Sequence, residues 1–159
     1  MIATASSEEK RALALELGAD SAVDAREPEL NAALRDANDG AKVDIVLEMA
    51  GGHVFDQSLH ALAPFGRLVV YGMASGEPNS VQSGALMARS QAVIGFWLVH
   101  CFGRAGMIAE PLQELFDLVA SGDLRVVEGE VYGLSEVRRA HEDMQARRTS
   151  GKLVLDPAR

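Results

Sequence analysis

Four histidines and one cysteine are the side chains that could bind a metal ion or form a nucleophile with its base. They are His53, His60, His100, Cys101 and His141. His53 and His60 lie seven residues apart with no second ligand pair nearby, and Cys101 beside His100 offers too few ligands for a closed zinc site. No Ser-His-Asp or Cys-His arrangement is supported by a nucleophile turn. The sequence therefore predicts no metal site and identifies no catalytic residue.

Small residues gather where a buried strand is expected to end. Met49, Ala50 and Gly51 directly follow the nearly continuous apolar run Val43–Leu47, and α/β sheets bind ligands at the carboxyl ends of their strands. A ligand-facing turn is one interpretation of these residues. The other is that the Gly-Gly pair only begins the next helix.

Short apolar runs alternate with helical patterns along the first two thirds of the chain. The expected strands are Ile2–Ala5, Ala22–Asp24, Val43–Leu47, Arg67–Tyr71 and Ala92–Leu98, with Ser6 and Glu9 as a capping box and residues 73–84 as a loop. This alternation predicts a parallel sheet covered on both faces. Beyond it we expect a helix over Ile108–Val119 closed by Gly122, an extended segment Arg125–Tyr132, a helix capped by Ser135, and a strand Lys152–Leu155.

Composition bounds the class of protein. The chain has 159 residues, a net charge of −8 and 48% hydrophobic residues, which is typical of one globular domain. This acidity argues against a nucleic-acid or anionic-membrane surface as the main binding partner. No apolar run is long enough to span a membrane, and the first residues lack the pattern of a signal peptide. We therefore expect a soluble, cytoplasmic protein.

The order of the motifs resembles the nucleotide-binding half of the medium-chain dehydrogenase/reductase superfamily, also called the zinc-type alcohol dehydrogenase superfamily. The closest resemblance is to its quinone oxidoreductase branch. The motifs are Ile2–Lys10, Leu17–Asp20, Val43–Gly52, Leu62–Gly76, Gly95–Leu98, Leu118–Gly122 and Ser150–Leu155. The resemblance implies an α/β fold: an incomplete Rossmann-type, doubly wound parallel sheet that lacks its first strand and glycine loop, plus a C-terminal helix and strand segment. It also implies a partial NAD(P)-binding domain over residues 1–98 and a segment over residues 99–159 that packs back on a catalytic domain.

The missing first strand raises a question about the middle of the sheet. No G-x-G-x-x-G motif precedes the first helix, and the resemblance places the absent strand between Ile2–Ala5 and Val43–Leu47. Those two strands would pair directly, accept a strand from another chain, or leave backbone groups unpaired. The chain alone is expected to bind NADPH poorly and to be inactive, since the absent loop supplies most pyrophosphate contacts.

The resemblance also implies a set of cofactor-binding residues. They are Ser6, Ser7, Lys10, Met49, Ala50, Gly51, Tyr71, Gly72, Met73, Phe96, Trp97 and Lys152. Ala5 stands where NAD-preferring relatives carry an acid, so NADP(H) is expected, with NAD as the alternative. Arg26 is kept, whereas Ala25 replaces a tyrosine that contacts adenine in many relatives. Zinc ligands of zinc-dependent relatives lie in a domain that this sequence does not contain.

The implied activity is NADPH-dependent reduction of a quinone or of an activated alkene such as an enone. A fragment of a zinc-dependent alcohol dehydrogenase or enoyl reductase is one alternative. A non-catalytic, truncated module that dimerises is another. In related enzymes the strand near Val93–Leu98 pairs with its two-fold mate, and its long apolar stretch without a charge or proline fits an edge that must be covered. We therefore expect a homodimer through this strand.

Overall fold

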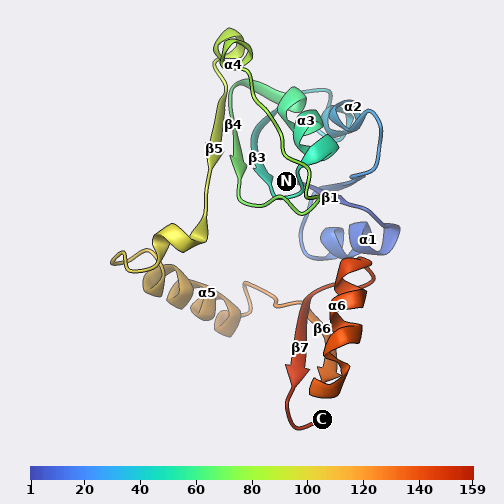
Figure 1. The fold of residues 1–159 in the computed structure, drawn as a ribbon. Coiled ribbons are helices and arrows are strands. Elements are labelled where there is room, and N and C mark those ends of the chain that lie inside the picture. Colours follow the sequence, from blue (N-terminus) through green and yellow to red (C-terminus); the bar gives the residue numbers. More distant parts are fainter. The chain divides into compact units, whose positions relative to one another are not determined.

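The computed structural model describes all 159 residues and divides the chain into two compact units, Met1–Arg104 and Ala105–Arg159 (Figure 1). Unit 1 contains five strands and five helical segments. In chain order they are β1 (Ile2–Ala5), α1 (Glu8–Glu16), β2 (Ser21–Asp24), α2 (Leu30–Asp36), β3 (Val43–Glu48), α3 (Gly52–Ala61), β4 (Leu62–Val70), α4 (Ser83–Arg89), β5 (Ala92–Gly95) and the 3₁₀ helix η1 (Leu98–Cys101).

The strands of unit 1 form two parallel sheets. One sheet pairs β1 with β2, and the other has the order β3-β4-β5. In the second sheet Leu68 of β4 lies between Val46 of β3 and Val93 of β5. β1 is not hydrogen-bonded to β3. The structure thus leaves the centre of the expected sheet unpaired, which is one of the three outcomes that the sequence left open.

The helices α2 and α3 join the two sheets. Leu30 and Leu34 of α2 form one hydrophobic cluster with Ala61 of α3, and Ile2 of β1 and Val43 of β3 both pack against it. On the same helix, Phe55 packs with Leu62 and Leu68 in a second cluster. Burying this apolar surface on one side of both sheets provides the main stabilisation of unit 1.

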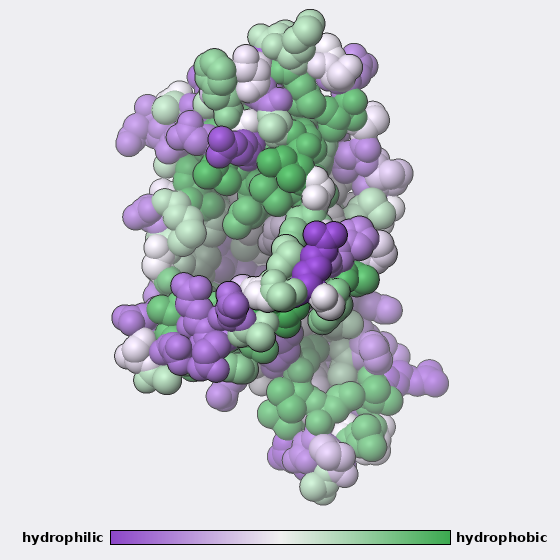
Figure 2. Space-filling model, turned by 90° about the vertical axis from the view of Figure 1, so that its left-hand side faces the viewer, coloured by the Kyte–Doolittle hydropathy of each residue, from purple (hydrophilic) through white to green (hydrophobic).

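The other face of the β3-β4-β5 sheet is bare. Ile45, Leu47 and Ile94 are 63%, 70% and 44% exposed, and the strand register places Leu47 and Ile94 on either side of Val69. The expectation that β3 is buried on both faces is therefore wrong within this unit, because no element of unit 1 covers the second face. Figure 2 shows hydrophobic side chains exposed on the side of the molecule that carries β5.

The expected strand ending at Leu98 is also wrong. β5 stops at Gly95, because its neighbour β4 stops at Val70 and offers no backbone beyond that point. The Phe96 N–H still donates to the carbonyl of Val70 at 2.8 Å, and the chain then turns into η1 at Leu98. The edge available for pairing with a mate is therefore shorter than the sequence predicts.

Two helix caps differ from their expected positions. Ser7, not Ser6, is the N-cap of α1, and its Oγ accepts the Lys10 N–H at 3.3 Å. Ser135 lies inside a short 3₁₀ turn, η2 (Leu134–Glu136), so it does not cap the helix that follows. There Glu136 reaches back to accept the Gly133 N–H at 2.9 Å.

Unit 2 contains α5 (Ala109–Ser121), β6 (Glu128–Gly133), η2, α6 (Val137–Gln145) and β7 (Lys152–Asp156). α5 ends where Gly122 adopts a left-handed conformation, φ 84°, as expected from the sequence. β6 and β7 pair in parallel, and Tyr132 of β6 is fully buried. No helix of the structure combines the length and the apolar character needed to cross a membrane.

Candidate functional site

Two consecutive turns meet at the carboxyl ends of β3 and β4. The Ala74 N–H donates to the Met49 carbonyl at 2.9 Å, and the Ser75 N–H donates to the Ala50 carbonyl at 2.7 Å. Gly72 permits this approach, because a Cβ on it would lie 2.9 Å from the Met49 carbonyl oxygen. The predicted residues Met49, Ala50, Gly72 and Met73 are thus brought together.

The N–H groups of Ala50, Gly51 and Gly52, which lead into α3, are hydrogen-bonded by side chains of this chain. Glu48 Oε1 accepts the N–H groups of Ala50 and Gly51 at 2.8 and 2.9 Å, and Asn79 Oδ1 accepts the Gly52 N–H at 2.8 Å. Gly51 has φ 78°, and a Cβ there would lie 2.9 Å from Ser75 Oγ. This turn therefore offers a close, small surface to a ligand, while the N–H groups of Ala50, Gly51 and Gly52 are not free to hold a phosphate.

A hollow of about 460 Å³ lies where β4 and β5 end. It is lined by Val70, Tyr71, Gly72, Met73, Gly95, Phe96, Trp97 and His100. Five of the predicted cofactor residues therefore share one site: Tyr71, Gly72, Met73, Phe96 and Trp97. A Cβ added at Gly95 would meet no atom within 4 Å, so the absence of a side chain there leaves room for a flat ring.

His100 is a residue of this hollow that the sequence did not identify. Its ring lies edge-on to Trp97, with centroids 5.4 Å apart and planes at 67°, and the His100 backbone N–H donates to the Trp97 carbonyl at 3.0 Å. The neighbouring Cys101 is buried and anchors η1. The only signal in the sequence was that His100 follows Trp97 by three residues. The 3₁₀ helix η1 brings these two side chains to the same side of the chain.

Charged residues surround the turn after β1. Arg11 donates to the Ala5 carbonyl at 3.3 Å and pairs with Asp24 at 2.9 Å, while Arg26 binds the same carboxylate through two nitrogens. These hydrogen bonds, first those from Arg26, hold the pKa of Asp24 far below its ordinary value. The predicted residues Ser6 and Ser7 lie on this turn and Lys10 lies in the first turn of α1, and Asp24 fixes the two arginines beside the turn.

Sequence reasoning missed Arg11 and Asp24 at this turn. The Asp24-Ala25-Arg26 spacing was visible in the sequence, and it lets the Arg26 N–H and guanidinium reach the same carboxylate. The remaining predicted residue, Lys152, begins β7 in unit 2, where its N–H donates to the Val127 carbonyl at 3.0 Å.

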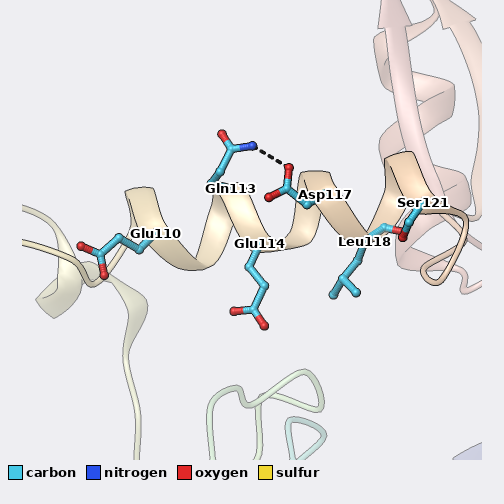
Figure 3. Close-up of a pocket in the computed structure, with 6 residues that line it drawn as sticks. All are labelled: Glu110, Gln113, Glu114, Asp117, Leu118 and Ser121. Carbon is cyan, nitrogen blue, oxygen red and sulfur yellow. Dashed lines mark hydrogen bonds between the residues drawn. The ribbon is translucent and has the colours of Figure 1, made fainter.

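A second and larger hollow, of about 570 Å³, lies along α5 (Figure 3). Its lining residues come from this single helix: Glu110, Gln113, Glu114, Asp117, Leu118 and Ser121. Gln113 Nε2 donates to Asp117 Oδ1 at 2.9 Å, as drawn in Figure 3. Three carboxylates on one exposed helix would repel a phosphorylated cofactor, so we place the candidate site at the smaller hollow.

No group of three or more His, Cys, Asp or Glu side chains is arranged to hold a metal ion. Cys101 and His100 are neighbours on η1, but Cys101 is buried whereas His100 lines the open hollow. The two do not share a site.

Comparison with known proteins shows the family to which the chain belongs. The family model described as "Zinc-binding dehydrogenase" matches residues 17–155. Quinone oxidoreductase of Pseudomonas aeruginosa is 34% identical over 161 residues, covering 99% of this chain and 49% of the relative. Prostaglandin reductase-3 of Mus musculus is 33% identical, covering 98% and 45%. The chain spans about half the length of the curated relatives it matches.

Solved structures agree with these relatives. The Escherichia coli quinone oxidoreductase complexed with NADPH superposes with a TM-score of 0.88 at 32% identity, covering 98% of this chain and 49% of that one. The quinone oxidoreductase of Thermus thermophilus superposes with a TM-score of 0.79 at 36% identity, covering 97% and 48%. The fold is thus that of the nucleotide-binding, Rossmann-like part of these enzymes.

Proposed function

Because this chain belongs to the zinc-binding dehydrogenase family, we propose that it is the cofactor-binding part of an NADPH-dependent oxidoreductase that reduces quinones or activated alkenes. The observation that carries the proposal is the hollow at the ends of β4 and β5, which gathers five of the predicted cofactor residues. The NADPH complex of a relative with the same fold supports it.

The hollow suits the nicotinamide end of the cofactor. Gly72 and Gly95 carry no side chains, while Tyr71, Phe96 and Trp97 supply aromatic surface for a flat ring. When bound, the dihydronicotinamide supplies a hydride to the substrate. Tyr71, Phe96 and Trp97 would hold and orient that ring.

The turn after β1 suits the 2′-phosphate of NADP(H). Ala5 brings no carboxylate to the strand end, Lys10 lies in the first turn of α1, and Arg11 and Arg26 both pair with Asp24 beside this turn. A phosphate dianion is favoured there, whereas an acid at position 5 would repel it. Met49, Ala50 and Gly51 would lie along the adenosine.

We also propose a homodimer in which β5 pairs with its mate. β5 is hydrogen-bonded to β4 on one side only, and exposed apolar side chains follow it at Phe96, Trp97 and Leu98. An apolar strand edge is protected from aggregation when a second copy pairs with it. The cytoplasm remains the proposed location.

The experiment that tests the activity is a fusion. This chain is joined to the half of the Pseudomonas aeruginosa quinone oxidoreductase that it does not match. The oxidation of NADPH by the fusion is then followed with a simple quinone as substrate. We expect quinone-dependent turnover by the fusion and none by the 159-residue chain alone. A folded fusion that oxidises alcohols but reduces no quinone or enone would contradict the proposal in favour of an alcohol dehydrogenase.

A further inference from the structure

The loop after β4 runs alongside the turn after β3 and the first turn of α3. Its first two attachments are the hydrogen bonds that the Ala74 and Ser75 N–H groups donate to the carbonyls of Met49 and Ala50. The chain then passes beside α3 on its way to α4 (Figure 1). We call residues 72–79 of this loop the strap, because they join the ends of two neighbouring strands.

Asn79 makes the last attachment of the strap. Its Oδ1 accepts the Gly52 N–H at 2.8 Å, its Nδ2 donates to the Gly52 carbonyl at 3.0 Å, and the same Nδ2 donates to Asp56 Oδ1 at 3.0 Å. Among residues 73–85 Asn79 alone is half-buried, whereas all the others are exposed. A loop side chain with three hydrogen bonds to one helix fixes the loop on that helix.

The strap also packs closely against the glycines at the start of α3. A Cβ on Gly51 would lie 3.1 Å from the Glu77 carbonyl oxygen, and a Cβ on Gly52 would lie 2.5 Å from Glu77 Oε2. Between its attachments the strap has a hydrogen bond of its own, since Ser75 Oγ accepts the Glu77 N–H at 3.1 Å. The middle of the strap thus fits one conformation, and Asn79 holds its far end.

The strap connects two parts of the proposed cofactor site. Its beginning, Gly72 and Met73, lines the hollow at the ends of β4 and β5. Its attachments lie along residues 49–52, on the proposed adenosine side. Asn79 itself does not line the hollow. Its contacts can therefore affect the cofactor only through the position of the strap.

We propose that Asn79 is a positioning residue for NADPH: by holding the strap on α3, it keeps the hollow and residues 49–52 in one relation before the cofactor binds. This inference rests on the proposed function. If the strap were released, only the fraction of molecules in which it lies in place would bind NADPH, so the apparent affinity would fall by that fraction. Turnover with saturating NADPH would change little, because the bound cofactor would hold the strap in place.

Amide exchange in the 159-residue chain tests whether Asn79 holds the strap. We expect Asn79→Ala to speed exchange at the Ala74 and Ser75 amides about tenfold or more, as measured by NMR. Asn38→Ala is the matched control, because Asn38 Nδ2 also donates to two backbone carbonyls, in the turn after α2. Unaltered exchange in Asn79→Ala would overturn the proposal.

The fusion with the P. aeruginosa half tests whether the strap positions the cofactor. The Kd of NADPH is measured by fluorescence titration without quinone, and kcat is measured at saturating NADPH. We expect Asn79→Ala to raise Kd about tenfold while kcat stays within about twofold, and Asn38→Ala to change neither. A purely structural role would lower the melting temperature of Asn79→Ala without changing its Kd, and this result would overturn the proposal.

The same titration separates this inference from the proposed function. A wild-type fusion that binds no NADPH would contradict the proposed function itself. Because Kd is measured without quinone, a fusion that binds NADPH but reduces no quinone contradicts the proposed activity and leaves the test of Asn79 intact.

An exchange of side chains tests the contact of Asn79 with Asp56. Asn79→Asp places two carboxylates next to each other, so we expect it to raise Kd at least as much as Asn79→Ala. The double variant Asn79→Asp with Asp56→Asn keeps the hydrogen bond with donor and acceptor exchanged, and it still offers an acceptor to the Gly52 N–H. We expect it to recover most of the lost affinity. A double variant that binds NADPH no better than Asn79→Asp would contradict the proposal, because this contact would then not hold the strap.

Discussion

Position 5 is the residue at which cofactor choice is decided, if the turn after β1 holds the adenosine ribose. The Ala5 carbonyl accepts a hydrogen bond from Arg11, and the Ala5 side chain carries no charge. In the fusion we expect Ala5→Asp to shift the ratio of kcat/KM for NADPH over NADH by about tenfold toward NADH, since a carboxylate would repel the 2′-phosphate.

Steady-state kinetics with both cofactors measure this ratio, and Ala5→Ser serves as a control that changes size without charge. A ratio that Ala5→Asp leaves unaltered would place the ribose elsewhere.

His100 is the residue that the structure adds to the site, and Trp97 can report on it. Trp97 is the only tryptophan of the chain, and the two rings meet edge to face. The imidazole edge packs against the indole ring, so we expect replacement of His100 to change the emission spectrum of Trp97.

His100→Gln is expected to change the Trp97 emission spectrum at pH 7, and His141→Gln in unit 2 to leave it unaltered. Identical spectra of the wild type and His100→Gln would show that the two rings do not touch in solution.

At the scale of elements, the sequence predicts strands and helices correctly where a single periodicity of apolar residues runs through the segment. β1, β3 and α5 appear where apolar periodicity placed them. The end of β5 did not follow, because Phe96, Trp97 and Leu98 have strand propensity but no neighbouring backbone once β4 ends. A strand ends where its partner ends, and this information lies outside the segment itself.

The residues of the candidate site could likewise be predicted from the sequence only in part. Turns adjacent to predicted strands could be found from spacing, and Tyr71 and Trp97 do share a hollow. His100, Arg11 and Asp24 could not be assigned, since their contacts depend on a 3₁₀ turn and on the pairing of β1 with β2. A side chain that contacts residues of another element can be assigned to a site only when the position of that element is known.

An ion-pair cluster ties α6 to β6 in unit 2. Asp143 accepts from Arg148 at 2.6 Å and from the Tyr132 hydroxyl at 3.1 Å, while Arg139 lies over the Tyr132 ring and pairs with Glu130. Arg148, and then Tyr132, hold the pKa of Asp143 below its ordinary 3.8. Burial, with the hydrogen bond to Asp143 second, raises the pKa of Tyr132 to about 12, so the phenol remains a donor.

The sign of the pH effect follows from the lowered pKa of Asp143. A carboxyl whose pKa is lower in the folded state stabilises the fold above its unfolded pKa, and this contribution is lost as the pH falls through the folded value. We expect Asp143→Asn to lower the melting temperature of unit 2 by a few degrees at pH 7, and the difference from wild type to disappear as the pH falls through the lowered pKa of Asp143.

Circular dichroism melts at several pH values measure this, with Glu142→Gln, an exposed neighbour on α6, as the control. A deficit of Asp143→Asn that stays constant down to acid pH would contradict the ionic explanation.

At the scale of the whole molecule, the open edge of β5 decides the state of assembly. The Phe96 N–H donates to Val70 in β4, so by alternation the N–H groups of Val93 and Gly95 point to the open side. We expect the 17.0 kDa chain to sediment at twice its mass at micromolar concentration.

Gly95→Pro removes one donor from this side without touching a bond to β4, and a Cβ there meets no atom within 4 Å. We therefore expect Gly95→Pro to shift the chain to monomer, whereas Gly95→Ala, which keeps the N–H, remains dimeric. The open edges of β1 and β3 offer a rival surface for self-association, and the pair of variants separates the two. If Gly95→Pro remains fully dimeric, the dimer contact does not lie at β5. A wild-type chain that sediments as a monomer would contradict the proposed homodimer.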